Sequence, residues 1–234
     1  MNKTLQESIY HSEHEISSII RERLINQQKP FCSNDNISSC ILPFEKEKLL
    51  IEVQNKVKQL LESLLIDTVN DPNTQETAYR VAKMFLNETL SGRFDPPPKI
   101  TTFPNTKKLD ELVVTKAEVK SLCSHHFQNI YGWAWIGILY DDKLLGLSKI
   151  HRIVDYFSRR PQIQEELVVQ IADYIEDVVK PRGVGVVIKA NHNCVKARGV
   201  EQDSFMVNSV LRGVLLEAPL KTEFFELIKM SGNL

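Results

Sequence analysis

Apolar residues recur every three or four positions over several stretches of this chain, and that spacing is typical of helices with one buried face. The clearest case covers residues 45–65, where glutamate and lysine occupy the positions between the leucines and valines. Weaker versions of the same pattern predict further helices. The expected helices cover about residues 5–28, 45–65, 77–91, a stretch that begins at 148, the stretch from Pro161 to 179, and 220–229.

The pattern changes to that of strands after three consecutive prolines at residues 96–98, which force an extended backbone. Residues 128–140 are rich in aromatic and β-branched side chains, and Asp141-Asp142-Lys143 after them has the composition of a tight turn. We therefore expect most of the sheet in the second half of the chain. The predicted strands cover about residues 112–120, 128–140, 144–147, 184–190 and 204–216.

The first 44 residues form a separate N-terminal extension in this interpretation. Its polar helix would stop at Pro30, and the Ser/Asn-rich stretch over residues 32–39 has no periodicity and is typical of a linker. Cys32 and Cys40 lie in this region without a histidine nearby, so we interpret them as ordinary thiols rather than as a metal site.

The composition limits the class of protein. Of 234 residues, 42% are hydrophobic, which is enough for a core, and 29 basic residues against 30 acidic ones give a net charge of −1. This balance argues against general binding to nucleic acids or membrane surfaces. No run approaches the roughly 20 apolar residues of a membrane helix, and the N-terminus lacks the apolar core of a signal peptide. Four cysteines are too few for a secreted disulfide framework, so we expect a cytoplasmic protein with reduced thiols.

Two short stretches carry the side chains with the most distinctive chemistry. Cys123, His125 and His126 stand within four residues, and His192 and Cys194 form a second group later in the chain. Thiolate sulfur and imidazole nitrogen are the ligands that zinc prefers, and a catalytic zinc takes three of them and leaves a fourth position for water. Cys123, His126 and Cys194 could supply the three ligands, which would leave His125 and His192 beside the metal as acid–base groups.

Each of these residues also has an ordinary structural explanation. A cysteine is often a small buried apolar residue, and a histidine can be a hydrogen-bonded member of a core. A structural zinc site normally has four protein ligands in two close pairs, whereas His192 and Cys194 are only two residues apart. Three ligands with two spare histidines favour an open, catalytic site over a closed one.

Several charged residues have two interpretations as well. Lys149 and Arg152 stand near the start of the helix expected from Ser148, which could cap it. Cations there oppose the helix dipole, but together with free backbone N–H groups they would form an anion site. Lys83 lies on an earlier predicted helix, and its ordinary explanation is a position on the solvent-exposed face of that helix. Glu165 lies in the first turn after Pro161, where an acid favours the dipole.

Several blocks of the sequence, taken in this order, resemble the GTP cyclohydrolase I family. They are residues 76–84 (Glu-Thr-Ala-Tyr-Arg-Val-Ala-Lys-Met), 123–126 (Cys-Ser-His-His), 145–149 (Leu-Gly-Leu-Ser-Lys), 158–165 (Ser-Arg-Arg-Pro-Gln-Ile-Gln-Glu) and 192–199 (His-Asn-Cys-Val-Lys-Ala-Arg-Gly). The resemblance extends from about residue 45 to residue 218. It implies a GTP cyclohydrolase I-like domain over 45–234, with a helical part at 45–95 and a T-fold part at 110–218.

The fold class that the resemblance implies is α+β. The family has an antiparallel sheet with two helices packed on one face, the tunnelling fold or T-fold, preceded by an N-terminal helical region. Its subunits form a ring-like barrel, usually a homodecamer, with active sites at the subunit interfaces. A sheet with exposed edges can satisfy them by closing into such a ring.

The activity that the resemblance implies is the zinc-dependent hydrolysis of GTP to 7,8-dihydroneopterin triphosphate and formate, a first step of pterin or tetrahydrofolate-type biosynthesis. Carried over by motif, the Zn²⁺ ligands are Cys123, His126 and Cys194. The catalytic residues are His125, His192 and Ser148. A buried carboxylate at Glu165, beside Gln164, would hold the guanine edge. The side chains expected to bind the triphosphate are Lys83, Ser148, Lys149, Arg152 and Arg198.

The chain departs from the family pattern at two noteworthy positions. Ser124 stands where the family usually has an acid, and Ala78 stands where it usually has proline. An alternative hypothesis is therefore a non-catalytic nucleotide-binding or regulatory member with a structural zinc. A related deazapurine nitrile reductase is a third hypothesis, but it would need a nucleophilic cysteine and a nicotinamide, and the chain has no nicotinamide fingerprint.

Overall fold

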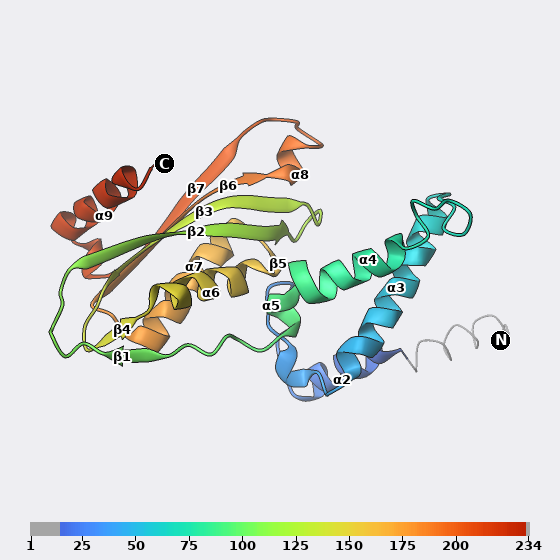
Figure 1. Cartoon of the computed structure of the whole chain (residues 1–234), viewed down its shortest axis with the longest axis horizontal. Helices are drawn as coiled ribbons and strands as arrows, with labels where there is room; N and C mark the ends of the chain where they lie inside the picture. Colours follow the sequence, from blue (N-terminus) through green and yellow to red (C-terminus); the bar gives the residue numbers. More distant parts are fainter. Residues whose placement is uncertain (1–14, 233–234) are drawn as a thin grey trace. The chain divides into compact units, whose positions relative to one another are not determined.

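The chain divides between Pro96 and Pro97 into two units, and the computed structural model describes residues 15–232. The first unit is helical, and the second contains both sheets, as Figure 1 shows. The division falls inside the run of three prolines, whose extended backbone cannot continue a helix.

Helices of the first unit follow the apolar periodicity of the sequence. The helix predicted over residues 45–65 is α3 (Glu45–Ser63). The helix predicted over 5–28 begins outside the described residues, and its described part is α2 (Ile16–Asn26). A short 3-10 helix, η1 (Ser38–Cys40), lies between α2 and α3.

The helix predicted over residues 77–91 is interrupted and extends further. It consists of α4 (Thr77–Met84), one π-helical segment, η2 (Phe85–Thr89), and α5 (Ser91–Phe94). Gly92, the residue after the predicted end, does not end the helix but is buried inside α5. Its carbonyl accepts a hydrogen bond from Asn36 Nδ2 at 2.9 Å, so this glycine packs against an earlier segment.

The segment predicted as a linker is held by hydrogen bonds to the helices around it. Asn36 Nδ2 also donates to the Asp95 carbonyl at 2.7 Å. Arg23 on α2 donates to both carboxylate oxygens of Glu45 on α3, at 2.7 and 2.8 Å. The division of the chain after residue 44 stays a prediction, but residues on its two sides are bonded to one another.

The second unit contains a five-stranded sheet in the order β5-β2-β3-β6-β7. Its neighbours pair antiparallel except for β2 and β5, which are parallel. A separate small sheet pairs β1 with β4. The strands are β1 (Thr102–Pro104), β2 (Leu112–Cys123), β3 (Asn129–Leu139), β4 (Lys143–Leu145), β5 (Pro161–Gln162), β6 (Gly183–His192) and β7 (Phe205–Gly213).

Two helices, α6 (Leu147–Ser158) and α7 (Gln164–Val179), cover one face of this sheet (Figure 1). Alternate residues of the central strands, such as Ala134, Ile136 and Ile188, are buried beneath them. The expectation of an α+β fold with an antiparallel sheet and packed helices is confirmed. The short elements that complete the unit are α8 (Asn193–Lys196) and η3 (Val214–Leu216).

A third helix, α9 (Ala218–Met230), packs on the opposite face of the sheet. Its Phe224 is fully buried with Trp135 of β3 and Val187 of β6. A β-carbon at Gly137 would lie 2.5 Å from the Phe224 ring, so a glycine is needed for this close approach. The fold implied by the family resemblance had two helices on one face. Periodicity predicted the helix over residues 220–229, but it does not show which surface the apolar side of a helix covers.

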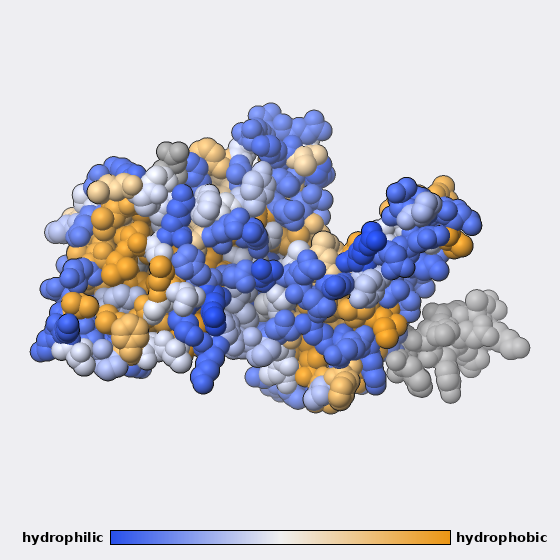
Figure 2. All heavy atoms as spheres, viewed as in Figure 1, coloured by the Kyte–Doolittle hydropathy of each residue, from blue (hydrophilic) through white to orange (hydrophobic). Residues whose placement is uncertain are grey.

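The remainder of this second face carries exposed apolar side chains. Tyr131, Trp133, Phe205 and Val207 are each more than 40% exposed, and Figure 2 shows apolar groups interspersed with polar ones on the surface. Among the helices of residues 15–232, none has the length and apolar character needed to cross a bilayer.

We expect Arg23→Ala to lower the free energy of unfolding by about 1–3 kcal/mol, because it leaves the largely buried Glu45 carboxylate without its main donor. The hydrogen bonds from Arg23 lower the pKa of Glu45. The stability from this pair is therefore present above the ordinary carboxyl pKa and is lost as the pH falls through the lowered value. Urea unfolding of Arg21→Ala, an exposed position on the same helix, is the control, and equal losses would contradict the prediction.

Candidate active site

Strand pairing brings the two predicted groups to the same end of the sheet. Ile130 of β3 lies opposite Ser121 of β2 on one side and opposite His192 of β6 on the other. Cys123 is the last residue of β2, and Cys194 lies in the one-turn helix directly after β6. The register of three strands therefore places thiols from distant parts of the sequence side by side.

The loop between β2 and β3 is a tight turn that presents two histidines. The Cys123 N–H donates to the Gln128 carbonyl at 2.8 Å, and the Phe127 N–H donates to the Cys123 carbonyl at 2.9 Å. Phe127 has a φ of 53°, the left-handed conformation that reverses the chain. The rings of His125 and His126 meet edge to face, with centroids 6.3 Å apart, so the two imidazoles have different orientations.

Three potential metal ligands converge at this end of the sheet. The sulfurs of Cys123 and Cys194 and a ring nitrogen of His126 lie within 4.8 Å of one another. In the part of the chain that the structure describes, this is the one Cys, His, Asp and Glu cluster close enough to hold an ion. Ligands of one tetrahedral zinc, with bonds of about 2.0–2.3 Å, stand roughly 3.5–4 Å apart. The donor set therefore fits a metal ion and leaves a coordination position open.

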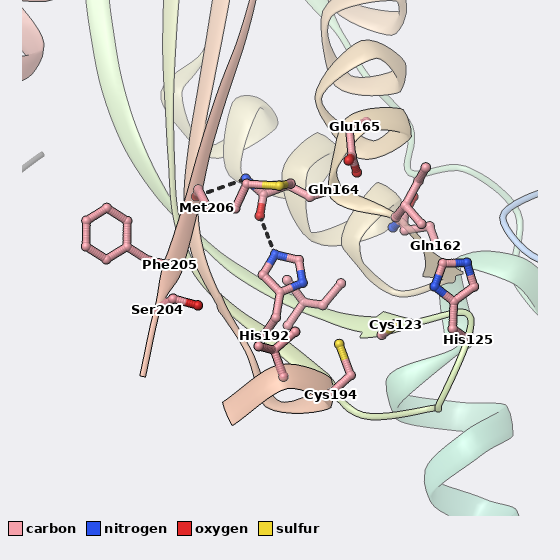
Figure 3. A pocket seen from close by; sticks show the side chains of 13 residues that line it. Cys123, His125, Gln162, Gln164, Glu165, His192, Cys194, Ser204, Phe205 and Met206 are labelled. Atoms are coloured by element: carbon pink, nitrogen blue, oxygen red, sulfur yellow. Dashed lines mark hydrogen bonds between the residues drawn. The ribbon is translucent and has the colours of Figure 1, made fainter. Parts of the chain in front are cut away.

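A cavity of about 280 Å³ adjoins these ligands, and Figure 3 shows the side chains around it. It is bounded by the end of β2, the first turn of α7, the end of β6 and the start of β7. Six residues expected at the site from the sequence line it: Cys123, His125, Gln164, Glu165, His192 and Cys194.

Burial sets the protonation of two of these groups. It lowers the pKa of His192, with partial opposition from the negative charge of Glu165, so this imidazole is neutral at pH 7. Burial also raises the pKa of the Cys194 thiol, and the neighbouring Cys123 sulfur adds to that effect. A bound metal ion would act against this effect, since it favours the thiolate form of a cysteine.

The first turn of α7 gives its first two residues different surroundings. Gln164 is fully buried, and its Oε1 lies 2.9 Å from His192 Nε2. Glu165 lines the cavity but is exposed, so the expectation of a buried carboxylate is wrong for this chain. The reason is geometric, because successive side chains of a helix point about 100° apart and only one of two neighbours can face the sheet.

The predicted triphosphate-binding residues do not line this cavity. Ser148, Lys149 and Arg152 lie near the start of α6, where Lys149 Nζ donates to the Lys99 carbonyl at 3.2 Å. Ser148 makes no capping hydrogen bond, because the helix begins one residue earlier with Gly146 as its N-cap. Of the other two residues, Arg198 is exposed beyond α8, and Lys83 is exposed on α4 of the first unit.

Sequence reasoning gave no role to Gln162, which also lines the cavity. It lies opposite Cys123 in the short parallel β2–β5 pair and is fully buried. Its Nε2 donates to the Phe157 carbonyl at 2.6 Å and to Ser121 Oγ at 3.1 Å. Its Oε1 has no hydrogen-bond partner within residues 15–232. The two glutamines of Pro161-Gln162-Ile163-Gln164 were a usable signal, since alternate positions of an extended segment share a side.

Asn208 of β7 is a further residue that the sequence did not single out. Its Oδ1 accepts a hydrogen bond from Gln164 Nε2 at 2.8 Å, and its Nδ2 donates to the Gln164 carbonyl at 3.3 Å. No local pattern marks it, because its partner lies 44 residues earlier.

The sequence is similar to proteins of one family. A sequence model of that family, described as GTP cyclohydrolase I, matches residues 53–229. The protein named GTP cyclohydrolase 1 from Aeromonas salmonicida is 38% identical over 75% of this chain and 79% of its own length. The proteins of the same name from Aeromonas hydrophila and Wigglesworthia glossinidia brevipalpis are 37% and 38% identical, over 76% and 78% of this chain and 83% and 87% of their own lengths. The chain belongs to the GTP cyclohydrolase I family.

Proposed function

We propose that this protein is a zinc-dependent enzyme that converts GTP and water to 7,8-dihydroneopterin triphosphate and formate. The observation that carries the proposal is the convergence of Cys123, His126 and Cys194 at a cavity that also contains His125 and His192. Family membership supports the substrate, since the relatives are named for GTP.

The proposed metal is zinc because the donors are two thiols and one imidazole, the soft and borderline ligands that zinc prefers. Three protein ligands would leave a position for water. The metal would lower the pKa of that water, so that it could lose a proton at neutral pH and attack the purine ring. The same set of reduced thiols favours a reducing compartment such as the cytoplasm.

The two remaining histidines are the proposed proton carriers. His192 is neutral and partly buried, so it is suited to accept a proton. His125 lines the same cavity and is exposed, so it can exchange protons with solvent. Opening the purine ring and releasing formate both require protons to move between oxygen and nitrogen atoms, and a pair of imidazoles on the cavity wall can hold and return them.

Recognition of GTP would involve the exposed Glu165 and the basic residues outside the cavity. A carboxylate can accept hydrogen bonds from both the N1–H and the exocyclic amine of guanine. A base without this pair of donors would bind less tightly. We propose that the triphosphate binds a cluster of cations that a neighbouring subunit helps to complete. Its cations would be Lys83, Lys149, Arg152 and Arg198, and the hydroxyl group of Ser148 would add a hydrogen bond.

A ring-shaped homodecamer with the T-fold is the proposed assembly. The edge strand β7 has a described partner on one side only, β6, and such an edge readily pairs with another chain. Exposed Phe205 and Val207 on β7 add apolar surface of the kind that subunit interfaces bury.

Formate release from GTP is the first test of this function. We expect the purified, zinc-loaded protein to release one formate per GTP consumed, and removal of the metal with a chelator to abolish release until zinc is restored. A protein shown to contain zinc that binds GTP but releases no formate would support the non-catalytic alternative. Ser124→Glu would then test whether the missing acid is the cause.

Metal binding depends on individual thiols in this proposal. Cys123→Ser and Cys194→Ser should each reduce zinc from about one ion per chain to a small fraction, because two remaining ligands bind weakly. Cys32→Ser is the matched control, since Cys32 is exposed and lies outside the metal group. Elemental analysis after dialysis gives the zinc content, and full occupancy in either of the first two variants would exclude the proposed ligand set.

Guanine recognition can be tested at Glu165. Glu165→Gln should raise the KM for GTP by roughly 10- to 100-fold, because a charge-assisted hydrogen bond contributes about 1.5–3 kcal/mol. Glu166→Gln, the next residue of the same helical turn, is the control and should leave KM nearly unchanged. Equal effects of the two substitutions would indicate a general charge effect rather than recognition of the base.

A further inference from the structure

Besides His192, the side chain of Gln164 has three hydrogen-bond partners, which lie on the strands β6 and β7. Its Nε2 lies 3.1 Å from the Ile188 carbonyl on β6, 3.2 Å from the Met206 carbonyl on β7, and 2.8 Å from Asn208 Oδ1. The residue is fully buried although it lines the cavity. All four of its amide contacts are therefore to protein atoms, which differs from the guanine contact expected from the sequence.

These contacts fix which way the amide faces. Two of the three partners of Nε2 are backbone carbonyls, which can only accept hydrogen bonds. The reversed amide would place Oε1 against two carbonyl oxygens with no hydrogen between the acceptors, which is unfavourable. Asn208 is itself oriented by the bond from its Nδ2 to the Gln164 carbonyl. The oxygen of Gln164 must therefore face His192.

The orientation of the amide determines the tautomer of His192. Oε1 can only accept, so His192 Nε2 must carry the hydrogen of the 2.9 Å bond. In a neutral imidazole the other nitrogen, Nδ1, then has no hydrogen and can accept one. Figure 3 shows Gln164 on one side of the His192 ring and Cys194 toward the other side, and both residues line the cavity.

We propose that Gln164 is a positioning residue that holds His192 with the hydrogen on Nε2, so that Nδ1 is the nitrogen available as a hydrogen-bond acceptor for the reacting molecule. Gln164 makes no contact with GTP in this proposal and acts only through His192. The inference rests on the proposed function for the role of His192 in the reaction, but the tautomer follows from this chain alone.

A double-mutant cycle tests whether Gln164 acts through His192. Gln164→Met should lower kcat by about 100-fold or more, the range of a lost acid–base group, while the Kd for GTP stays within about twofold. In a His192→Ala background the same substitution should have no further effect on kcat, because the effects of residues that act as a unit do not add. A raised Kd for GTP, or effects that multiply, would overturn the proposal in favour of direct substrate contact.

The tautomer itself can be measured without any turnover. The sample is the sedimented wild-type protein with ¹⁵N-labelled histidine, measured by magic-angle-spinning NMR. The signals that are missing from the spectrum of the His192→Gln variant belong to residue 192. We expect a protonated Nε2 and an unprotonated Nδ1 near pH 8, and the opposite pattern would refute the proposal. This readout separates the two proposals, because a protein that releases no formate could still show the expected tautomer. If Gln164→Met does not fold, this measurement still tests the tautomer that the proposal requires.

Discussion

The register of the β2–β3–β6 ladder is the constraint on which the whole site depends. Side chains alternate between the faces of a sheet, so a slip of one residue would turn every side chain to the opposite face. The register is held by the burial of alternate residues such as Val119, Ala134 and Ile188 beneath α6 and α7. Hydrophobic packing that has no chemical role therefore decides whether the two thiols meet.

The site also depends on a buried amide, the side chain of Gln164. Gln164 connects the start of α7 to β6 and β7 and at the same time touches His192. Burying an amide is unfavourable unless its hydrogen-bonding groups are satisfied, and here each has a partner. The network thus keeps the helix, two strands and one imidazole in a single arrangement, so the stability of this corner and the chemistry of the cavity depend on the same bonds.

Local features of the fold could be predicted from the sequence, because short-range spacing encodes them. The helix over 45–65 and the strand over 128–140 are present within one or two residues of the expected ends. Cys123, His126 and Cys194 were also identified in advance, since few residue types bind zinc. The roles of Gln164, Asn208 and α9 were not, because each depends on contacts between segments far apart in the chain, which neither periodicity nor motif spacing records.

Because α9 lies so close to the sheet, the residue types allowed at positions 137, 185 and 224 depend on one another. Phe224 occupies space that side chains at Gly137 and Gly185 would otherwise fill. A larger residue at either glycine would displace the helix, and a smaller residue at 224 would leave a hollow above bare backbone. The three positions can therefore change only together, and an engineered chain with a redesigned C-terminal helix would have to carry the shape of that aromatic ring with it.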